Sequence, residues 1–200
     1  MNITPELRHK WRENFKFLGD ILYNFAVIFV IVAVIRYTLI SPFQVNGSSM
    51  LPNLETSEFL MIDKLSYYFH EPERGDVVVL VPPENTDTYY VKRILGLPGD
   101  KIEFLNGQVI VHNKEHPEGI KIDEEYLATD NNKTYLPTHE NRIIDIPDDQ
   151  YFVMGDNRRA SNDSRSWGLL HRRSIEGRVW FVFFPLNKIR LVPSPTYQTL

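Results

Sequence analysis

A single apolar run near the N-terminus constrains this chain more than any other feature of its sequence. Residues 25–35 contain no polar side chain, and the run lengthens to 21–40 if the Arg36 side chain extends toward lipid headgroups. A helix needs roughly 20 residues to cross the hydrocarbon core of a bilayer. The run therefore predicts one membrane-spanning helix over residues 21–40.

Basic residues on either side of the run predict its orientation. Four of them precede it: Arg8, Lys10, Arg12 and Lys16. After Arg36 the next basic residue is Lys64. Because positive charge gathers on the cytoplasmic side of a membrane helix, residue 1 is expected in the cytoplasm and the body of the chain on the far side.

Two other interpretations of the run are a cleaved secretory signal and a buried core helix of a soluble protein. Residues 36–45 have the sequence RYTLISPFQV, without a small-x-small cleavage site, which argues against the first. The expected organisation is a cytoplasmic segment over 1–20, a signal anchor over 21–40, a folded domain over 41–193 and a tail over 194–200.

Beyond Ser41 the pattern changes to short apolar segments separated by Gly, Pro, Asn and Asp, which is typical of an all-β domain. Eight segments are expected to be strands: residues 59–62, 76–81, 89–95, 101–104, 109–112, 143–146, 150–154 and 179–184. Asn106-Gly107 supplies the positive φ angles of a tight hairpin turn. Residues 115–140 are polar and are expected to lie outside the core. The predicted fold class is mainly β: a compact β-rich domain after a single transmembrane helix.

The charge balance excludes one class of partner. Lys and Arg total 22 against 26 Asp and Glu, and a net charge of -4 does not provide the basic field that nucleic-acid binding requires. The absence of cysteine removes disulfides, thiolate nucleophiles and cysteine zinc sites. The sequence predicts no particular oligomeric state.

Three segments carry residue types that catalyse reactions: residues 45–52 (VNGSSMLP), 89–100 (YYVKRILGLPGD) and 155–168 (GDNRRASNDSRSWG). Each alone has a structural explanation. A Gly-Ser-Ser run is usually a loop, a lysine in a strand usually faces solvent, and an Asp- and Arg-rich loop is usually a solvated turn. Their combination is what indicates a function.

In combination the segments resemble those of bacterial type I signal peptidase, or leader peptidase, a Ser-Lys serine endopeptidase. Five elements occur in that family's order: an anchor, a serine directly before methionine, Arg-Gly-Asp-Val-Val at 74–78, Tyr-x-Lys-Arg ending in Gly-x-Pro-Gly-Asp, and Gly-Asp-Asn-Arg. The resemblance implies a catalytic domain that removes N-terminal signal peptides from exported preproteins without a cofactor. It also implies a single-pass protein in the lipid bilayer of the bacterial plasma membrane, with the catalytic domain on the outer side.

The resemblance carries over residue by residue. Ser49, the serine before methionine, matches the family's nucleophile, and Lys92 of the Tyr-x-Lys-Arg segment matches its general base. Ser161 matches a hydroxyl that orients the lysine. Asp163 and Arg165 match a paired acid and base that hold the loop, and we expect them to be structural.

A lysine acts as a base only if its pKa is lowered, and the sequence around Lys92 is compatible with such a lowering. Lysine accepts a proton only when neutral, so its pKa must fall from about 10.4, and burial lowers it by disfavouring the ammonium form. Strand alternation places Tyr90, Lys92 and Ile94 on one face, opposite Val91 and Arg93. Lys92 is therefore expected to point inward and Arg93 away, and the reaction to pass through an acyl-enzyme.

The oxyanion that forms during attack needs hydrogen-bond donors, and the backbone N–H of Ser49 is the first expected one. Some family members use a serine hydroxyl two positions earlier, where this chain has Gly47. The second donor therefore stays open. Arg159 and Ala160 also stand where Asp and Asn are common in the family, so no role is carried over to them.

Two histidines offer an alternative site. His112 and His116 are four residues apart, as in helical zinc sites, but Pro117 follows and no His-Glu-x-x-His motif is present. A surface loop is the favoured interpretation, and no metal is expected.

Two other functions are compatible with parts of the pattern. One is a self-cleaving Ser-Lys regulator, which would be cytosolic and joined to a DNA-binding domain; the anchor and the acidic balance oppose it. The other is a noncatalytic, membrane-tethered β module that binds proteins through the same loops. An inactive relative would be expected to lose Ser49 or Lys92, and both are present.

Overall fold

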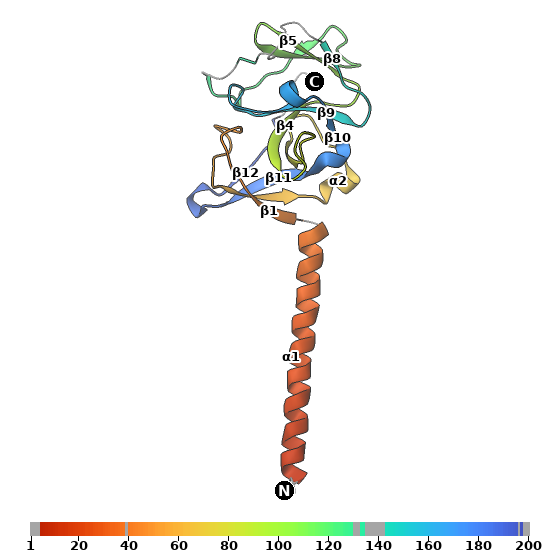
Figure 1. Ribbon diagram of the computed structural model, residues 1–200, viewed down its shortest axis with the longest axis vertical. Helices are drawn as coiled ribbons and strands as arrows, with labels where there is room; N and C mark the ends of the chain where they lie inside the picture. The colour runs from red at the N-terminus through yellow and green to blue at the C-terminus, as the bar shows by residue number, and fades with distance from the viewer. Residues whose placement is uncertain (1–4, 39, 130–132, 135–142, 196, 198–200) are drawn as a thin grey trace. The chain divides into compact units, whose positions relative to one another are not determined.

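The computed structural model describes residues 5–38, 40–129, 133–134, 143–195 and 197. The chain divides into two compact units, Met1–Ile40 and Ser41–Leu200, which are drawn together in Figure 1 and described separately below. The predicted cytoplasmic segment, anchor and tail include residues 1–4, 39, 196 and 198–200, which lie outside the described residues.

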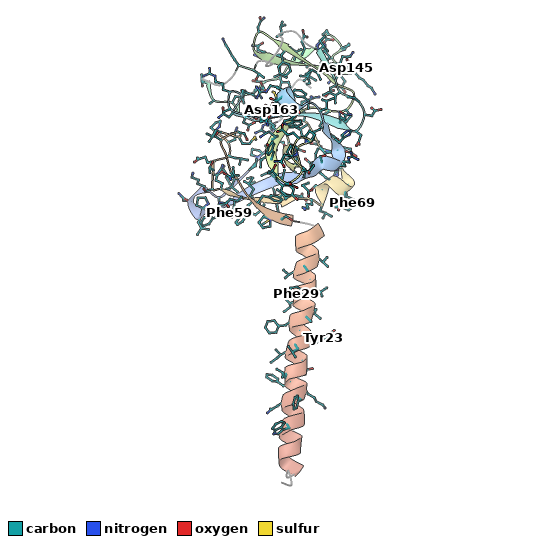
Figure 2. All side chains as sticks on the ribbon, in the orientation of Figure 1. Tyr23, Phe29, Phe59, Phe69, Asp145 and Asp163 are labelled. Atoms are coloured by element: carbon teal, nitrogen blue, oxygen red, sulfur yellow. The ribbon has the colours of Figure 1, made fainter. Side chains whose placement is uncertain are left out.

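The first unit is one long helix, α1 (Pro5–Thr38). Its window Asn14–Val34 is long and apolar enough to cross a membrane, and none of that window is buried. Figure 2 shows the side chains of Tyr23 and Phe29 extending from the helix, and both are exposed. An exposed apolar helix of this length is a candidate membrane span. It begins nearer the N-terminus than the run 21–40, and Ile40 already belongs to strand β1.

The second unit contains two antiparallel sheets. The larger has the order β1-β2-β11-β3-β4-β9-β10, with β12 paired to β11, and the smaller has the order β7-β6-β5-β8. The strands of the larger sheet are β1 (Ile40–Gln44), β2 (Phe59–Asp63), β3 (Val77–Leu80), β4 (Tyr90–Gly96), β9 (Gln150–Met154), β10 (Leu170–His171), β11 (Ile175–Phe184) and β12 (Arg190–Leu191). Those of the smaller sheet are β5 (Lys101–Leu105), β6 (Gln108–His112), β7 (Ile120–Lys121) and β8 (Ile143–Asp145).

Short helices connect some of these strands. They are α2 (Ser66–Phe69), α3 (Ser164–Trp167), η2 (Arg172–Ser174) and η3 (Leu186–Lys188). Strands dominate the second unit, so the mainly β fold class predicted from the sequence is confirmed.

The predicted hairpin is also confirmed. Strands β5 and β6 pair antiparallel, with Leu105 opposite Gln108. Between them Asn106 and Gly107 have φ angles of 52° and 78°, as a type I′ turn requires. Strands β7, β10 and β12 were not predicted, because each has two residues and exists through pairing with a longer neighbour. Strand β1 was not predicted because Pro42 interrupts its apolar pattern.

Strand β4 positions the candidate site because it is buried on both faces. Ile94 packs with Val78 and Tyr151 in one cluster, whereas Leu95 packs with Phe152 in another. A strand in the middle of a sheet with both faces covered exposes neither set of alternate side chains. Arg93 does point to the face opposite Lys92, as predicted, but that face is buried as well.

Two polar stretches contribute more to the interior than their composition suggests. Ile122 and Thr134 are buried, although residues 115–140 were expected to lie outside the core; 130–132 and 135–140 are outside the described residues. In the predicted tail, the Ser194 hydroxyl donates to Asp76. Tyr197 packs against the cluster around Leu95. The described part of the tail is therefore attached to the body.

Candidate active site

Ser49 lies in a tight turn between β1 and β2. The turn is closed by hydrogen bonds from Leu51 N to the Ser48 carbonyl and from Leu54 N to the Met50 carbonyl. The Met50 and Leu54 side chains are buried in the cluster beneath the turn. The buried Met50 and Leu54 side chains therefore hold the turn in place, while Ser49 stays partly exposed in a cleft of about 240 Å³.

The cleft is formed by this turn, the start of β4 and the loop after Asn157. Its lining residues are Gln44, Val45, Asn46, Gly47, Ser48, Ser49, Met50, Tyr89, Tyr90, Val91, Lys92, Ala160 and Asn162.

Lys92 reaches Ser49 from β4. Its Nζ lies 2.9 Å from Ser49 Oγ, which is hydrogen-bond distance between residues 43 positions apart in the sequence. The Lys92 side chain is 3% exposed and lies beside the Tyr90 ring, 5.1 Å from Nζ to the ring centroid. The fold therefore places a buried amine directly against an accessible hydroxyl.

Burial lowers the pKa of Lys92 to about 8. Asp163 and Asp156 act in the opposite direction, because their negative charges stabilise the ammonium, and Arg165 lowers the pKa a little further. The lysine that was predicted to need a lowered pKa therefore has one, and desolvation is the main cause.

Ser161 lies beside the pair without bonding to Lys92. A Cβ built on Gly155 would come within 2.3 Å of Ser161 Oγ and 2.4 Å of the Ser49 carbonyl oxygen, so both groups press against a residue that has to be glycine. The Ser161 hydroxyl is buried, and no hydrogen bond of standard geometry reaches it from the described residues, although its interaction with the Asp163 carboxylate helps to lower the pKa of that group. Its role in orienting Lys92 stays a prediction.

Asp163 and Arg165 form a bidentate ion pair beneath this loop. Arg165 Nε and Nη2 each lie 2.8 Å from a carboxylate oxygen of Asp163, which also accepts from Gly155 N at 3.0 Å. Burial alone would raise the pKa of Asp163, but Arg165 and the Gly155 N–H lower it below its ordinary value. Arg165 also donates to the Arg158 carbonyl, so the pair ties both ends of the loop together.

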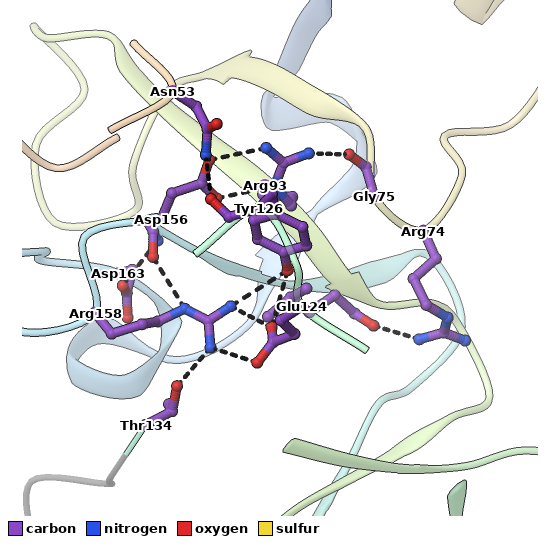
Figure 3. A network of polar contacts seen from close by, with 12 residues as sticks. Asn53, Arg74, Gly75, Arg93, Glu124, Tyr126, Thr134, Asp156, Arg158 and Asp163 are labelled. Atoms are coloured by element: carbon purple, nitrogen blue, oxygen red, sulfur yellow. Dashed lines mark hydrogen bonds and ion pairs between the residues drawn. The ribbon is translucent and has the colours of Figure 1, made fainter. Parts of the chain in front are cut away.

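On the opposite face of β4, Arg93 makes a bidentate ion pair and further polar contacts. Its Nε and Nη2 donate to the two carboxylate oxygens of Asp156 at 2.9 and 2.8 Å, and Nη1 donates to the Gly75 carbonyl (Figure 3). Asn53 Nδ2 donates to the same carboxylate, and the guanidinium stacks on the Tyr126 ring. Burial alone would lower the pKa of Arg93, but Asp156 raises it.

A second buried arginine continues this network. Arg158 pairs with both oxygens of Glu124 and donates to the Gly155 carbonyl and to the Thr134 hydroxyl. Figure 3 shows the two guanidinium groups with their acceptors around Tyr126. The segment from Gly155 to Arg158 is therefore held by two buried ion pairs.

The structure brings together all five residues singled out in the sequence, because Asp163 and Arg165 lie under the loop that carries Ser161. Sequence reasoning assigned no role to Asp156 or Arg158, although both stand in the Gly-Asp-Asn-Arg motif. The signal available in the sequence was that two residues of opposite charge flank Asn157 within that motif. Among the described residues, no group of three or more His, Asp or Glu side chains is arranged to hold a metal ion.

Comparison with known proteins identifies the family. The model of the family described as signal peptidase, peptidase S26, matches residues 18–184. The chain belongs to that family. The match includes both Ser49 and Lys92 and extends over most of the chain.

Similar relatives come from several bacteria. The chain is 41% identical over 170 residues to a signal peptidase I of Bacillus amyloliquefaciens, covering 82% of this chain and 87% of that protein. It is 40% identical over 171 residues to signal peptidase I S of Bacillus subtilis, covering 82% and 88%. A probable signal peptidase I of Synechocystis is 34% identical over 189 residues, covering 91% and 90%.

A crystal structure of a signal peptidase I from Enterococcus faecalis is 27% identical, with a TM-score of 0.45. That comparison covers 55% of this chain and 97% of that chain.

Proposed function

We propose that this serine endopeptidase of the signal peptidase family removes signal peptides from exported preproteins with Ser49 as nucleophile and Lys92 as general base. Family membership supports the activity and the substrate class. The observation that carries the residue assignment is the 2.9 Å separation between Ser49 Oγ and a buried lysine whose pKa is lowered to about 8.

In the first half of the reaction, neutral Lys92 takes the proton of the Ser49 hydroxyl as its oxygen attacks the scissile carbonyl carbon. The carbonyl oxygen becomes an oxyanion, which the Ser49 backbone N–H stabilises. When the intermediate collapses, the Lys92 ammonium gives its proton to the leaving amine, which is the new N-terminus of the mature protein. The signal peptide stays attached to Ser49 as an ester.

In the second half, a water molecule enters where the amine left. Neutral Lys92 takes a proton from it, the resulting hydroxide attacks the ester, and the proton returns to Ser49 Oγ as the bond breaks. The signal peptide leaves with a free carboxylate. Both halves use the same base, so protonation of Lys92 stops each of them.

The supporting residues act around this pair. Asp163 and Arg165 keep the loop in place through their bidentate ion pair. Ser161, pressed against Gly155 beside the nucleophile, orients the Lys92 amine during the reaction. We expect Ser161→Ala to lower turnover in a protein that melts normally, and Asp163→Ala to lower the melting temperature.

The proposal includes a lipid bilayer as partner. Helix α1 is a candidate span by length and composition. On the catalytic domain, large apolar side chains of β11, β12 and the turn between them are exposed: Trp180, Phe184, Leu186, Ile189 and Leu191. Exposed apolar patches of this kind are typical of membrane or protein contact. The N-terminus lies in the cytoplasm and the catalytic domain on the outer side of the plasma membrane.

A preprotein cleavage assay tests the catalytic assignment. Detergent-solubilised protein is incubated with a labelled preprotein, and the wild type is compared with Ser49→Ala and with Ser48→Ala. We expect Ser49→Ala to be inactive and Ser48→Ala to stay active. Activity in Ser49→Ala would refute the nucleophile assignment.

Single cysteines test the topology, because the chain has none of its own. A membrane-impermeant maleimide added to intact cells should label Asp148→Cys and leave Asn2→Cys unlabelled until the membrane is opened. The reverse pattern would refute the orientation.

A further inference from the structure

Asn157 holds both peptide groups on either side of the Ser49 α-carbon. Its side-chain Nδ2 donates to the Ser48 carbonyl at 3.1 Å. Its backbone N–H donates to the Ser49 carbonyl at 2.9 Å. These two bonds join the nucleophile turn to the loop of Arg158 across more than a hundred residues of sequence.

The first of these bonds determines where the Ser49 N–H points. The Ser48 carbonyl and the Ser49 N–H belong to one peptide plane, and in a trans peptide they point in opposite directions. Anchoring the carbonyl on Asn157 therefore aims the N–H away from Asn157. In the described part of the chain the Ser49 N–H donates no hydrogen bond. A bond to the carbonyl also polarises the N–H of the same amide and makes it a stronger donor.

Asn157 is itself held firmly, because its two neighbours are buried in ion pairs. Asp156 is bonded to Arg93, and Arg158 is bonded to Glu124. Gly155, which precedes them, packs directly on the Ser49 carbonyl. A donor that is fixed before the reaction begins costs no reorganisation when charge develops on the oxyanion.

We infer that the Asn157 side chain is a positioning residue that orients the Ser49 N–H as oxyanion donor. This inference rests on the proposed function, since it needs Ser49 to be the nucleophile. The inference also explains the two buried ion pairs, Arg93–Asp156 and Arg158–Glu124. They fix the position of the Asn157 amide, and Asn157 in turn fixes the orientation of the Ser49 N–H. Asn157 is not among the residues that line the cleft, and it acts through the peptide between Ser48 and Ser49.

Asn157→Ala tests the inference in the full-length protein. We expect kcat to fall by about 10- to 100-fold while KM stays within about twofold, because the bond to the oxyanion forms only in the transition state. A peptide aldehyde forms a hemiacetal with a serine hydroxyl, and its oxygen takes the place of the oxyanion. Its affinity should fall by the same factor as kcat/KM, while the pH at which activity rises stays unchanged.

Asn113→Ala is the matched control, because the Asn113 side chain also bonds to backbone groups, Glu115 N and His116 N, in a turn that does not line the cleft. It should keep full activity. If Asn157→Ala does not fold, Asn157→Leu carries the test under the same criteria, because it keeps a side chain of similar shape, removes the donor and adds no charge near Lys92.

Three outcomes would overturn the inference: full activity in the Asn157 variant, a fall in kcat with unchanged aldehyde affinity, or a shift of the pH profile, which would mean that Asn157 acts through Lys92. The parallel Ser49→Ala assay separates the two proposals. If Ser49→Ala is inactive and Asn157→Ala is fully active, only this inference fails. If Ser49→Ala is active, the proposed function fails first.

Discussion

The two faces of strand β4 each bury a basic side chain, but they shift its pKa in opposite directions. Lys92 and Arg93 are neighbours, and each is 3% exposed. Lys92 forms no ion pair within hydrogen-bond distance among the described residues, and burial lowers its pKa to about 8. Arg93 meets Asp156 in a bidentate pair, and its pKa is raised.

The difference teaches that burial alone does not decide the charge of a basic group. Desolvation disfavours both cations, but only Arg93 has a carboxylate in contact to offset it. The carboxylates that act on Lys92, Asp163 and Asp156, are engaged by Arg165 and Arg93. Because each carboxylate is paired with an arginine, neither forms an ion pair with the Lys92 amine, although both still raise its pKa. We propose that the Lys92 face serves catalysis, whereas the Arg93 face serves stability.

The largest expected effect is the loss of cleavage activity when the pair formed by Ser49 and Lys92 is removed. Ser49→Ala and Lys92→Met should each lower cleavage by about 10⁴-fold or more, and the double variant should lose little further, because the two groups act as one unit. Both variants should melt at or above the wild-type temperature. Steady-state cleavage and thermal melts check this, and losses that multiply in the double variant would contradict a shared mechanism.

Removing the Arg93–Asp156 ion pair on the other face should mainly lower the stability of the protein. Arg93→Met leaves the Asp156 carboxylate buried without its main partner, which should lower the free energy of unfolding by about 3 to 5 kcal/mol. Denaturant unfolding measures this. Arg93→Met combined with Asp156→Leu should recover part of the loss, because no unpaired charge remains. An Arg93→Met protein that is stable but inactive would contradict this prediction, because it would show that Arg93 acts in catalysis.

The pH profile should report the lowered pKa of Lys92. Activity should rise about tenfold per pH unit up to about 8 and level off above it, since only neutral Lys92 is a base. A histidine base would place the rise near about 6.5. Replacing each histidine in turn, including His70 and His171, should leave the rise in place. Its disappearance in one such variant would transfer the base role to that residue.

The same pKa predicts how stability depends on pH. Between about 8 and 10.4 the unfolded chain still binds the Lys92 proton while the folded protein has lost it, so stability should rise with pH across this window. The full effect is about 3 kcal/mol. Lys92→Met should remove this rise, whereas Arg93→Met should keep it over a narrower pH window, because the unpaired Asp156 carboxylate raises the pKa of Lys92.

The smallest effect is expected from removing residues 1–40. Both faces of β4 and all their partners belong to the unit Ser41–Leu200, so neither should change. The shortened protein should cleave a preprotein in detergent with a several-fold lower kcat/KM, because the anchor no longer confines enzyme and substrate to one surface. Inactivity of a well-folded shortened protein, with lipid supplied, would give the helix a part in shaping the site.

Local sequence patterns predicted the elements that are determined by residues close together in the chain, namely the long helix and the hairpin turn. The apolar run predicted a long helix, and Asn106-Gly107 predicted its hairpin because positive φ angles favour those residues wherever they stand. Strand β10 was not predicted because its two residues carry no pattern of their own and are defined by pairing with β9. The burial of Thr134 was not predicted because a polar residue is buried only when a partner such as Arg158 meets it.

The sequence by itself determined the residues that can do the chemistry, because a serine before methionine and a lysine in an apolar strand match one family's motifs. Only the tertiary structure decided that Lys92 forms no ion pair with any described residue while Arg93 is paired with Asp156, and that Asn157 lies against the Ser49 turn. The physical reason is that a pKa and a hydrogen bond both depend on distances between groups, and folding sets distances across 43 residues for Lys92 and 109 for Asn157.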